Sequence, residues 1–171
     1  APNGRSVAVD KTENGNQGTD LWTYDLQPDS SPKQFTFDSA IDAMPVWSPN
    51  SDRLLFASSR QQVFKLYMRN ADGAQEETLV VPTDTDSFPN DWSRDGKHVL
   101  YGRGRDLWLL TFPELTSRLF LKAPATVMNS QFSPNGKWVA YASNESGKWE
   151  VYVTSFPGAR GPWRVSTRGG E

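Results

Sequence analysis

Few residues of this chain have the chemistry for catalysis. His98 is the single histidine among the 171 residues, and cysteine is absent. Histidine is the usual general base near neutral pH, but His98 comes two residues after Gly96, at the start of an expected strand. No Gly-x-Ser-x-Gly stretch is present to hold a nucleophilic serine. We therefore predict a structural role for His98 and no catalytic residue in this chain.

Two stretches carry carboxylates of the kind that bind hard cations. Asp84-Thr85-Asp86 precedes one expected strand, and Asp42 lies in a similar place before Met44. Oxygen ligands suit Ca²⁺, which makes Asp84 and Asp86 weak candidates for a metal site. The alternative is that these aspartates terminate turns, and no complete EF-hand-like loop is present. We favour the turn role and expect neither a bound metal nor a cofactor.

Motifs for phosphate, nucleic acid and membranes are missing too. Gly102-Arg103-Gly104-Arg105 is not followed by a helical pattern, so it predicts a tight hairpin and not a phosphate-binding loop. The formal net charge of −2 leaves no basic surface for nucleic acid. No apolar run approaches the roughly 20 residues that span a bilayer. Neither nucleic-acid binding nor membrane insertion is expected.

An internal repeat predicts the elements that position these residues. Three stretches align, and Pro2-Asn3-Gly4 repeats their last part: Trp47-Ser48-Pro49-Asn50-Ser51, Trp92-Ser93-Arg94-Asp95-Gly96 and Phe132-Ser133-Pro134-Asn135-Gly136. A second landmark follows each copy: Leu21-Trp22, Leu66-Tyr67, Leu107-Trp108 and Val151-Tyr152. Its aromatic members are 45, 41 and 44 residues apart. Two landmarks with one period indicate a repeat protein.

Each repeat carries the signals of four short strands. Ser-Pro-Asn-Gly favours a tight turn, because proline fixes the first corner and glycine accepts a left-handed backbone. Ser51 replaces this glycine and Arg94 replaces this proline, which should loosen two turns without abolishing them. Four strands in about 43 residues is the size of a propeller blade. A two-sheet sandwich offers no reason for this period. We predict an all-β propeller of four-stranded antiparallel blades, with units at about 1–42, 43–86, 87–126 and 127–171.

The motif Pro-x-Trp-Ser-Pro-Asp-Gly followed by a Leu-Tyr strand resembles the TolB-type (WD-like) β-propeller repeat. Residues 44–50, 91–96 and 131–136 carry this resemblance. Residues 143–170 are similar to the C-terminal propeller region of bacterial receptor-like serine/threonine kinases, although no kinase motif is present. The resemblance implies a ring of six to eight blades. It also implies an extracytoplasmic location, periplasmic or at the cell surface, as part of a larger chain.

The resemblance implies binding as the function. A propeller binds through the loops and inner-strand ends that ring its channel. We predict a non-catalytic binding or scaffold module, an extracytoplasmic sensor or protein-interaction propeller of a larger bacterial protein. The alternative is the gating propeller of a prolyl-oligopeptidase-like serine peptidase. The expected contacts with a protein or a small ligand at the channel mouth are Asp42, Met44, Asp86, Phe88, Asn90, Met128 and Asn129.

The sequence also predicts how many strands are present. The chain begins at the proline of its first turn, so the first unit should lack its innermost strand. This leaves three complete blades and three further strands, about fifteen strands in all. Open blade faces carry apolar area and unpaired edges. We therefore expect self-association through the terminal blades.

Overall fold

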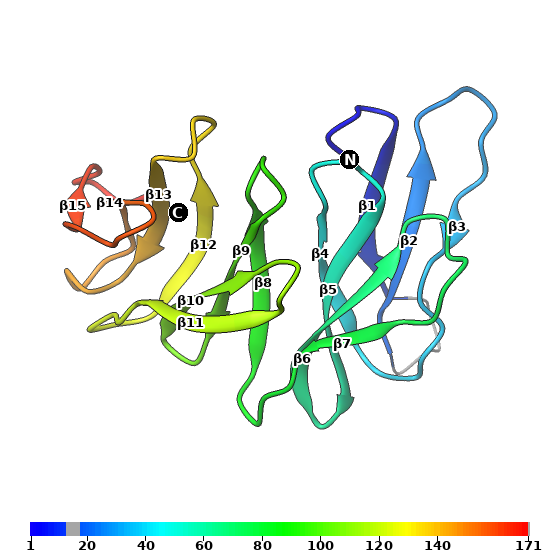
Figure 1. Cartoon of the computed structure of the whole chain (residues 1–171), viewed down its shortest axis with the longest axis horizontal. Helices are drawn as coiled ribbons and strands as arrows, with labels where there is room; N and C mark the ends of the chain where they lie inside the picture. Colours follow the sequence, from blue (N-terminus) through cyan, green and yellow to red (C-terminus); the bar gives the residue numbers. More distant parts are fainter. Residues whose placement is uncertain (13–17, 171) are drawn as a thin grey trace. The chain divides into compact units, whose positions relative to one another are not determined.

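The computed structural model describes residues 1–12 and 18–170, and every regular element in this part of the chain is a β-strand (Figure 1). The strands form one three-stranded and three four-stranded antiparallel sheets. The described residues contain no helix, and therefore none that is long and apolar enough to cross a membrane. The all-β prediction is confirmed, and the fifteen strands of the described residues match the expected number.

In every sheet, strands that are consecutive in the sequence are neighbours. The first sheet consists of β1 (Ser6–Lys11), β2 (Asp20–Asp25) and β3 (Lys33–Gln34). The second consists of β4 (Asp42–Trp47), β5 (Arg53–Gln61), β6 (Val63–Asn70) and β7 (Thr78–Val81). The third consists of β8 (Ser87–Trp92), β9 (His98–Arg103), β10 (Asp106–Thr111) and β11 (Thr116–Leu121). The fourth consists of β12 (Val127–Phe132), β13 (Trp138–Ser143), β14 (Glu150–Ser155) and β15 (Trp163–Arg164).

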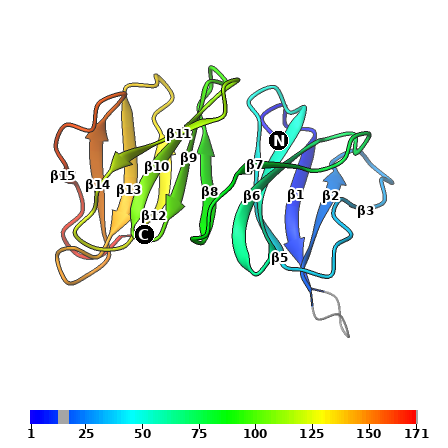
Figure 2. The same cartoon turned by 60° about the horizontal axis from the view of Figure 1, so that its bottom comes forward.

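The sheets belong to two compact units, Ala1–Pro89 and Asn90–Glu171, with the boundary inside β8. The first and second sheets share a core that includes Leu21, Phe35 and Phe56. In the second unit, Leu100 and Leu107 of the third sheet pack with Tyr141 of the fourth. Figure 2 shows β12, β13 and β14 of this unit side by side, in the order of their pairing. The meander gives the three four-stranded sheets the form of propeller blades.

Equivalent turns close the first hairpin of three sheets. The strands β4, β8 and β12 end at Trp47, Trp92 and Phe132, respectively. After β12, the N–H of Ser133 donates to the carbonyl of Trp138 (2.9 Å), and the Ser133 Oγ accepts the Trp138 N–H (3.0 Å). The same two bonds join the pairs Ser48–Arg53 and Ser93–His98. The predicted equivalence of the three aromatic residues is therefore confirmed.

The two departures from the turn motif keep the turn, as expected. Ser51 takes the left-handed backbone, with φ 62°, that Gly136 takes with φ 63°. Arg94 replaces proline, yet the Gly96 N–H still donates to the Ser93 carbonyl at 2.9 Å. The turn therefore depends on its first residue, the serine, and on the left-handed backbone of its last residue more than on proline.

Candidate functional site

Two of the predicted contact residues, Met44 and Asn129, lie at the same place in the first strands of their sheets. Regular pairing is interrupted between Ala43 and Val46 and, in the same way, between Met128 and Gln131. Inside these irregularities Met44 has φ 56° and Asn129 has φ 53°. A left-handed backbone costs most residues with a β-carbon roughly 1–2 kcal/mol, and asparagine less. Bulges of this kind change the direction of a side chain.

Both bulges present their side chain to solvent. Met44 is 53% exposed, and Asn129 is exposed as well. The third equivalent strand has Pro89 at this position, where the proline ring holds φ negative. The strain is therefore confined to the copies that expose a methionine or an asparagine. Strained and exposed residues of this kind are typical of binding surfaces.

The remaining predicted contacts differ in accessibility. Phe88, Asn90 and Met128 are half-buried. Phe88 packs against Phe64 at a ring-centroid distance of 5.0 Å. Asp86 is exposed and accepts the N–H of Phe64 at 2.9 Å. Asp86 and Phe88 thus meet at Phe64, and Met128 directly precedes Asn129 on β12.

Asp42 is an internal anchor. Its side chain is completely buried, and its carboxylate oxygens accept hydrogen bonds from Arg60 Nη2 at 3.2 and 3.3 Å. Arg60 also bonds Glu77 and the Ser58 Oγ, and its guanidinium lies 4.4 Å from the ring centroid of Tyr67. A partner cannot reach the Asp42 carboxylate without displacing Arg60, so the accessible part of this strand is the bulge at Met44.

The candidate metal ligands Asp84 and Asp86 are exposed in the connection before β8. The Asp86 carboxylate bonds the Phe64 N–H, which fits the turn role weighed for it above. Among residues 1–12 and 18–170, no three side chains of the types His, Cys, Asp and Glu gather as a metal ion requires.

His98 has the environment of a packing residue. Its ring meets the ring of Phe156 edge-on at 5.3 Å, and burial lowers the pKa of its imidazole. Nδ1 is buried, and no hydrogen-bond partner for it lies in the described part of the chain. This Nδ1 therefore lacks the carboxylate partner that orients a catalytic histidine.

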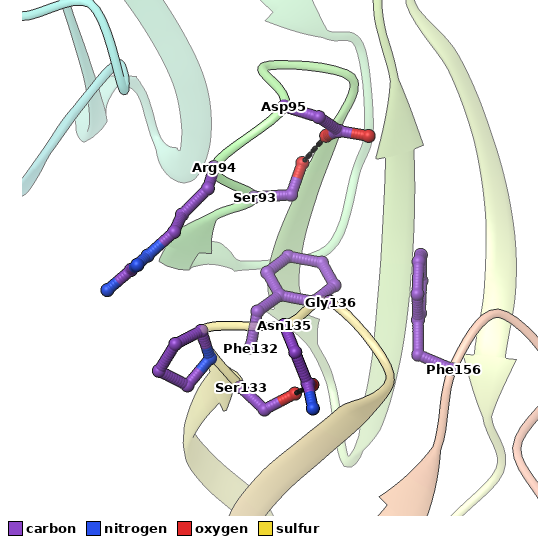
Figure 3. Close-up of a pocket in the computed structure, with 9 residues that line it drawn as sticks. Ser93, Arg94, Asp95, Phe132, Ser133, Asn135, Gly136 and Phe156 are labelled. Atoms are coloured by element: carbon purple, nitrogen blue, oxygen red, sulfur yellow. Dashed lines mark hydrogen bonds between the residues drawn. The ribbon is translucent and has the colours of Figure 1, made fainter.

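A pocket of about 260 Å³ lies in the second unit between two of the equivalent turns (Figure 3). One wall is the turn after β8 and the other is the turn after β12, while Phe156 closes one side from the end of β14. Phe132 and Phe156 are edge to face, with centroids 5.0 Å apart. The residues that line the pocket are Ser93, Arg94, Asp95, Phe132, Ser133, Pro134, Asn135, Gly136 and Phe156.

Most polar groups of this pocket are engaged within their own turns. Ser93 Oγ donates to Asp95 Oδ1 at 2.7 Å, and the Oγ of Ser133 lies 2.7 Å from Asn135 Oδ1, as the dashed lines in Figure 3 show. The Ser93 hydroxyl is the main reason why the pKa of Asp95 is lowered. Arg94 is exposed, and its guanidinium forms no hydrogen bond or salt bridge with the residues that the structure describes. Sequence reasoning noticed Arg94 only as a departure from the turn motif.

Asp91 sets the spacing between the two turns. Its Oδ2 accepts the N–H of Phe132 at 2.7 Å, and its Oδ1 accepts the N–H of Trp92 at 2.9 Å. Burial raises the pKa of the Asp91 carboxyl, and the two N–H donors and Arg94 oppose that rise. A single side chain thus ties β8 to β12 next to the pocket.

Comparison with solved structures identifies the fold. The chain aligns with the putative TolB of Agrobacterium tumefaciens at a TM-score of 0.82 and 17% identity, over 96% of this chain and 62% of that one. It aligns with TolB from Acinetobacter baumannii at 0.81 and 15%, over 96% and 42%. A structure from a study of two prolyl endopeptidases gives 0.68 and 16%, over 96% and 27%. By sequence, the chain matches no protein-family model and no curated protein.

These alignments show that the chain has the β-propeller fold of the TolB structures. At 15–17% identity they establish the fold alone. The chain spans less than two thirds of the length of either TolB chain.

Proposed function

We propose that this chain acts as a non-catalytic, protein-binding part of a β-propeller, in an extracytoplasmic sensor or interaction module of a larger bacterial protein. The observation that carries the proposal is the pair of exposed, left-handed residues Met44 and Asn129 at one repeat position. The fold can form this strand without strain, because Pro89 occupies the position in the third sheet with a negative φ.

The chemistry of the two side chains suits a protein partner. Methionine is flexible and polarisable, and it adapts to irregular apolar surfaces. Asparagine offers a donor and an acceptor, which match the peptide groups of a partner chain.

The experiment incorporates a photo-crosslinking amino acid at position 44, at position 129 or at the exposed control position Lys148. We expect one protein to crosslink from 44 and 129 and not from 148. The purified partner is then titrated with wild type, Met44→Gly and Asn129→Gly. Glycine removes the side chain and also relieves the left-handed backbone.

The two glycine variants separate binding from folding. Each should lower affinity about tenfold, as loss of an interface hot spot does, while it leaves the free energy of unfolding unchanged or higher by up to about 1 kcal/mol. Equal crosslinking from all three positions, or unchanged affinity of both variants for the crosslinked protein, would contradict the proposal.

A second candidate function is that of a gating propeller in a serine peptidase, favoured by the alignment with the prolyl endopeptidase structure. The coding sequence on both sides of residues 1 and 171 separates the two. An α/β-hydrolase domain supports the peptidase, and a kinase domain with a membrane span supports the sensor. Cell fractionation with an antibody against the chain tests the extracytoplasmic location.

A further inference from the structure

We propose that the pocket between residues 93–96 and residues 133–136 is a second binding site, which takes an acidic peptide segment. An apolar side chain of the peptide enters the pocket, and the carboxylate that follows it pairs with Arg94. The site is separate from the bulge described above, because it lies at the last residue of β12 and the turn after it, whereas Asn129 lies in that strand's first half.

The pocket has the size and lining for one side chain. Its roughly 260 Å³ is below the range of about 300–1,000 Å³ that encloses a small-molecule ligand. Phe132, Pro134 and Phe156 supply an apolar lining. Aromatic rings of this kind gain most from an aromatic or aliphatic guest.

Arg94 distinguishes this turn from its repeats. The other three copies have proline at the same place: Pro2, Pro49 and Pro134. Proline at a first turn corner stabilises by restricting the unfolded chain, and its loss here leaves the bonds of the turn unchanged. The exposed guanidinium gains no hydrogen bond or salt bridge within the described part of the chain. Within the described residues its charge acts on the Asp91 carboxyl, whose two oxygens already accept main-chain N–H groups, and we assign the open side of the guanidinium to a ligand.

Arg94 carries the one positive charge in the pocket lining, and the carboxylates near it are already held by hydrogen bonds. The Asp95 carboxylate accepts bonds from the Ser93 hydroxyl and the Lys97 N–H. Both oxygens of Asp91 accept main-chain N–H groups. The guanidinium of Arg94 extends away from the two phenyl rings in Figure 3 and stays free to meet a carboxylate outside the pocket. Arginine recognises carboxylates through paired N–H bonds.

The test is a titration of the full chain, labelled with ¹⁵N, followed by NMR. Three blocked peptides serve as probes: Gly-Phe-Asp-Glu-Gly, the uncharged Gly-Phe-Asn-Gln-Gly and the small Gly-Ala-Asp-Glu-Gly. We expect saturable shifts of the amide signals of residues 93–96 and 133–136 with the first peptide. The uncharged peptide and the alanine peptide should bind more weakly. Added salt should weaken the binding of the acidic phenylalanine peptide.

Variants then assign the charge. Arg94→Pro restores the residue of the other three turns, and Arg94→Gln removes the charge with less change of shape. Both variants should lower the affinity for the acidic peptide by roughly threefold to tenfold, the range for a partly exposed ion pair. The matched control is Arg105→Gln on the exposed β9–β10 connection, which should bind like wild type.

Each other outcome overturns the proposal. It fails if millimolar acidic peptide gives no saturable shift at the two turns, or if the uncharged peptide binds equally well. It also fails if both Arg94 variants bind like wild type. Should Arg94→Pro not fold, Arg94→Gln still decides the result, because an exposed arginine-to-glutamine change leaves the turn bonds in place.

Discussion

The bond between Asp91 and Phe132 makes a testable contribution to the stability of the second unit. Two replacements separate its parts. In the wild type the Phe132 N–H lies 2.7 Å from Asp91 Oδ2. Asp91→Asn keeps an oxygen that accepts this N–H and removes the charge. Asp91→Val, which introduces the residue found at the equivalent Val46, leaves the N–H without an acceptor.

The expected magnitudes follow from the partial burial of the bond. An N–H group that loses its acceptor in a buried place costs about 1–3 kcal/mol. For a chain of this length 1 kcal/mol changes Tm by roughly 2–4 °C. Asp91→Val should therefore lower Tm by about 2–12 °C, while Asp91→Asn stays within about 1 kcal/mol of wild type. Phe132 should exchange its amide hydrogen faster in Asp91→Val and at the wild-type rate in Asp91→Asn.

The pH dependence has a definite sign. Burial raises the pKa of the folded-state Asp91 carboxyl, so the folded chain binds this proton more readily than the unfolded chain. The stabilisation from this group is complete below the ordinary aspartate pKa and is lost as the pH rises through the raised value. Asn has no such titration, so the stability of Asp91→Asn relative to wild type should increase with pH across that window.

Thermal and urea unfolding from pH 3 to 7, with hydrogen exchange at Phe132, measure both effects. The reasoning is refuted if Asp91→Val is as stable as Asp91→Asn at neutral pH. It is also refuted if the stability difference between Asp91→Asn and wild type does not change with pH.

Two further predictions concern a turn and a sheet face. Gly136→Ala should destabilise by about 1–2 kcal/mol in urea unfolding, because its φ of 63° is left-handed although the added carbon meets no atom within 4 Å. The control Gly158→Ala, equally open but without a positive φ, should cost less than about 0.5 kcal/mol. We also propose self-association through the terminal blade. Trp138 and Trp163 are 42% and 51% exposed, and their ring centroids are 5.9 Å apart. Trp163→Ser should therefore reduce association, measured by sedimentation at micromolar concentration. A monomeric wild type would contradict this prediction.

The strands could be predicted from the sequence because their signals are local. The serine that opens each turn bonds residues within five positions of itself, so a short motif determines where one strand ends and the next begins. The paired aromatic landmark then fixes the period. Tolerance of Ser51 and Arg94 was also predictable, since the turn keeps its remaining bonds.

The candidate site was harder to predict, because its geometry depends on residues distant in sequence. Met44 was chosen as an inner-strand residue, but its left-handed backbone follows from the pairing of β4 with β5 and has no signal in the residue type. Asp42 was expected near a channel, and its burial depends on Arg60, 18 residues away. The pocket at Arg94 needs two turns about 40 residues apart, which the Asp91–Phe132 bond holds together.

Departures from the repeat have different meanings, and the structure separates them. Ser51 is strained, but its Oγ accepts the Asn3 N–H at 3.1 Å and so joins the first turns of two sheets. Ser51 therefore gains a structural contact in place of the glycine. Met44 is strained and Arg94 gives up a proline. Among the described residues neither side chain forms a hydrogen bond or salt bridge in exchange, although the Arg94 charge acts on the Asp91 carboxyl. Local rules that are broken without compensation are expected at functional sites, and for that reason we place binding at Met44 and Arg94 and not at Ser51.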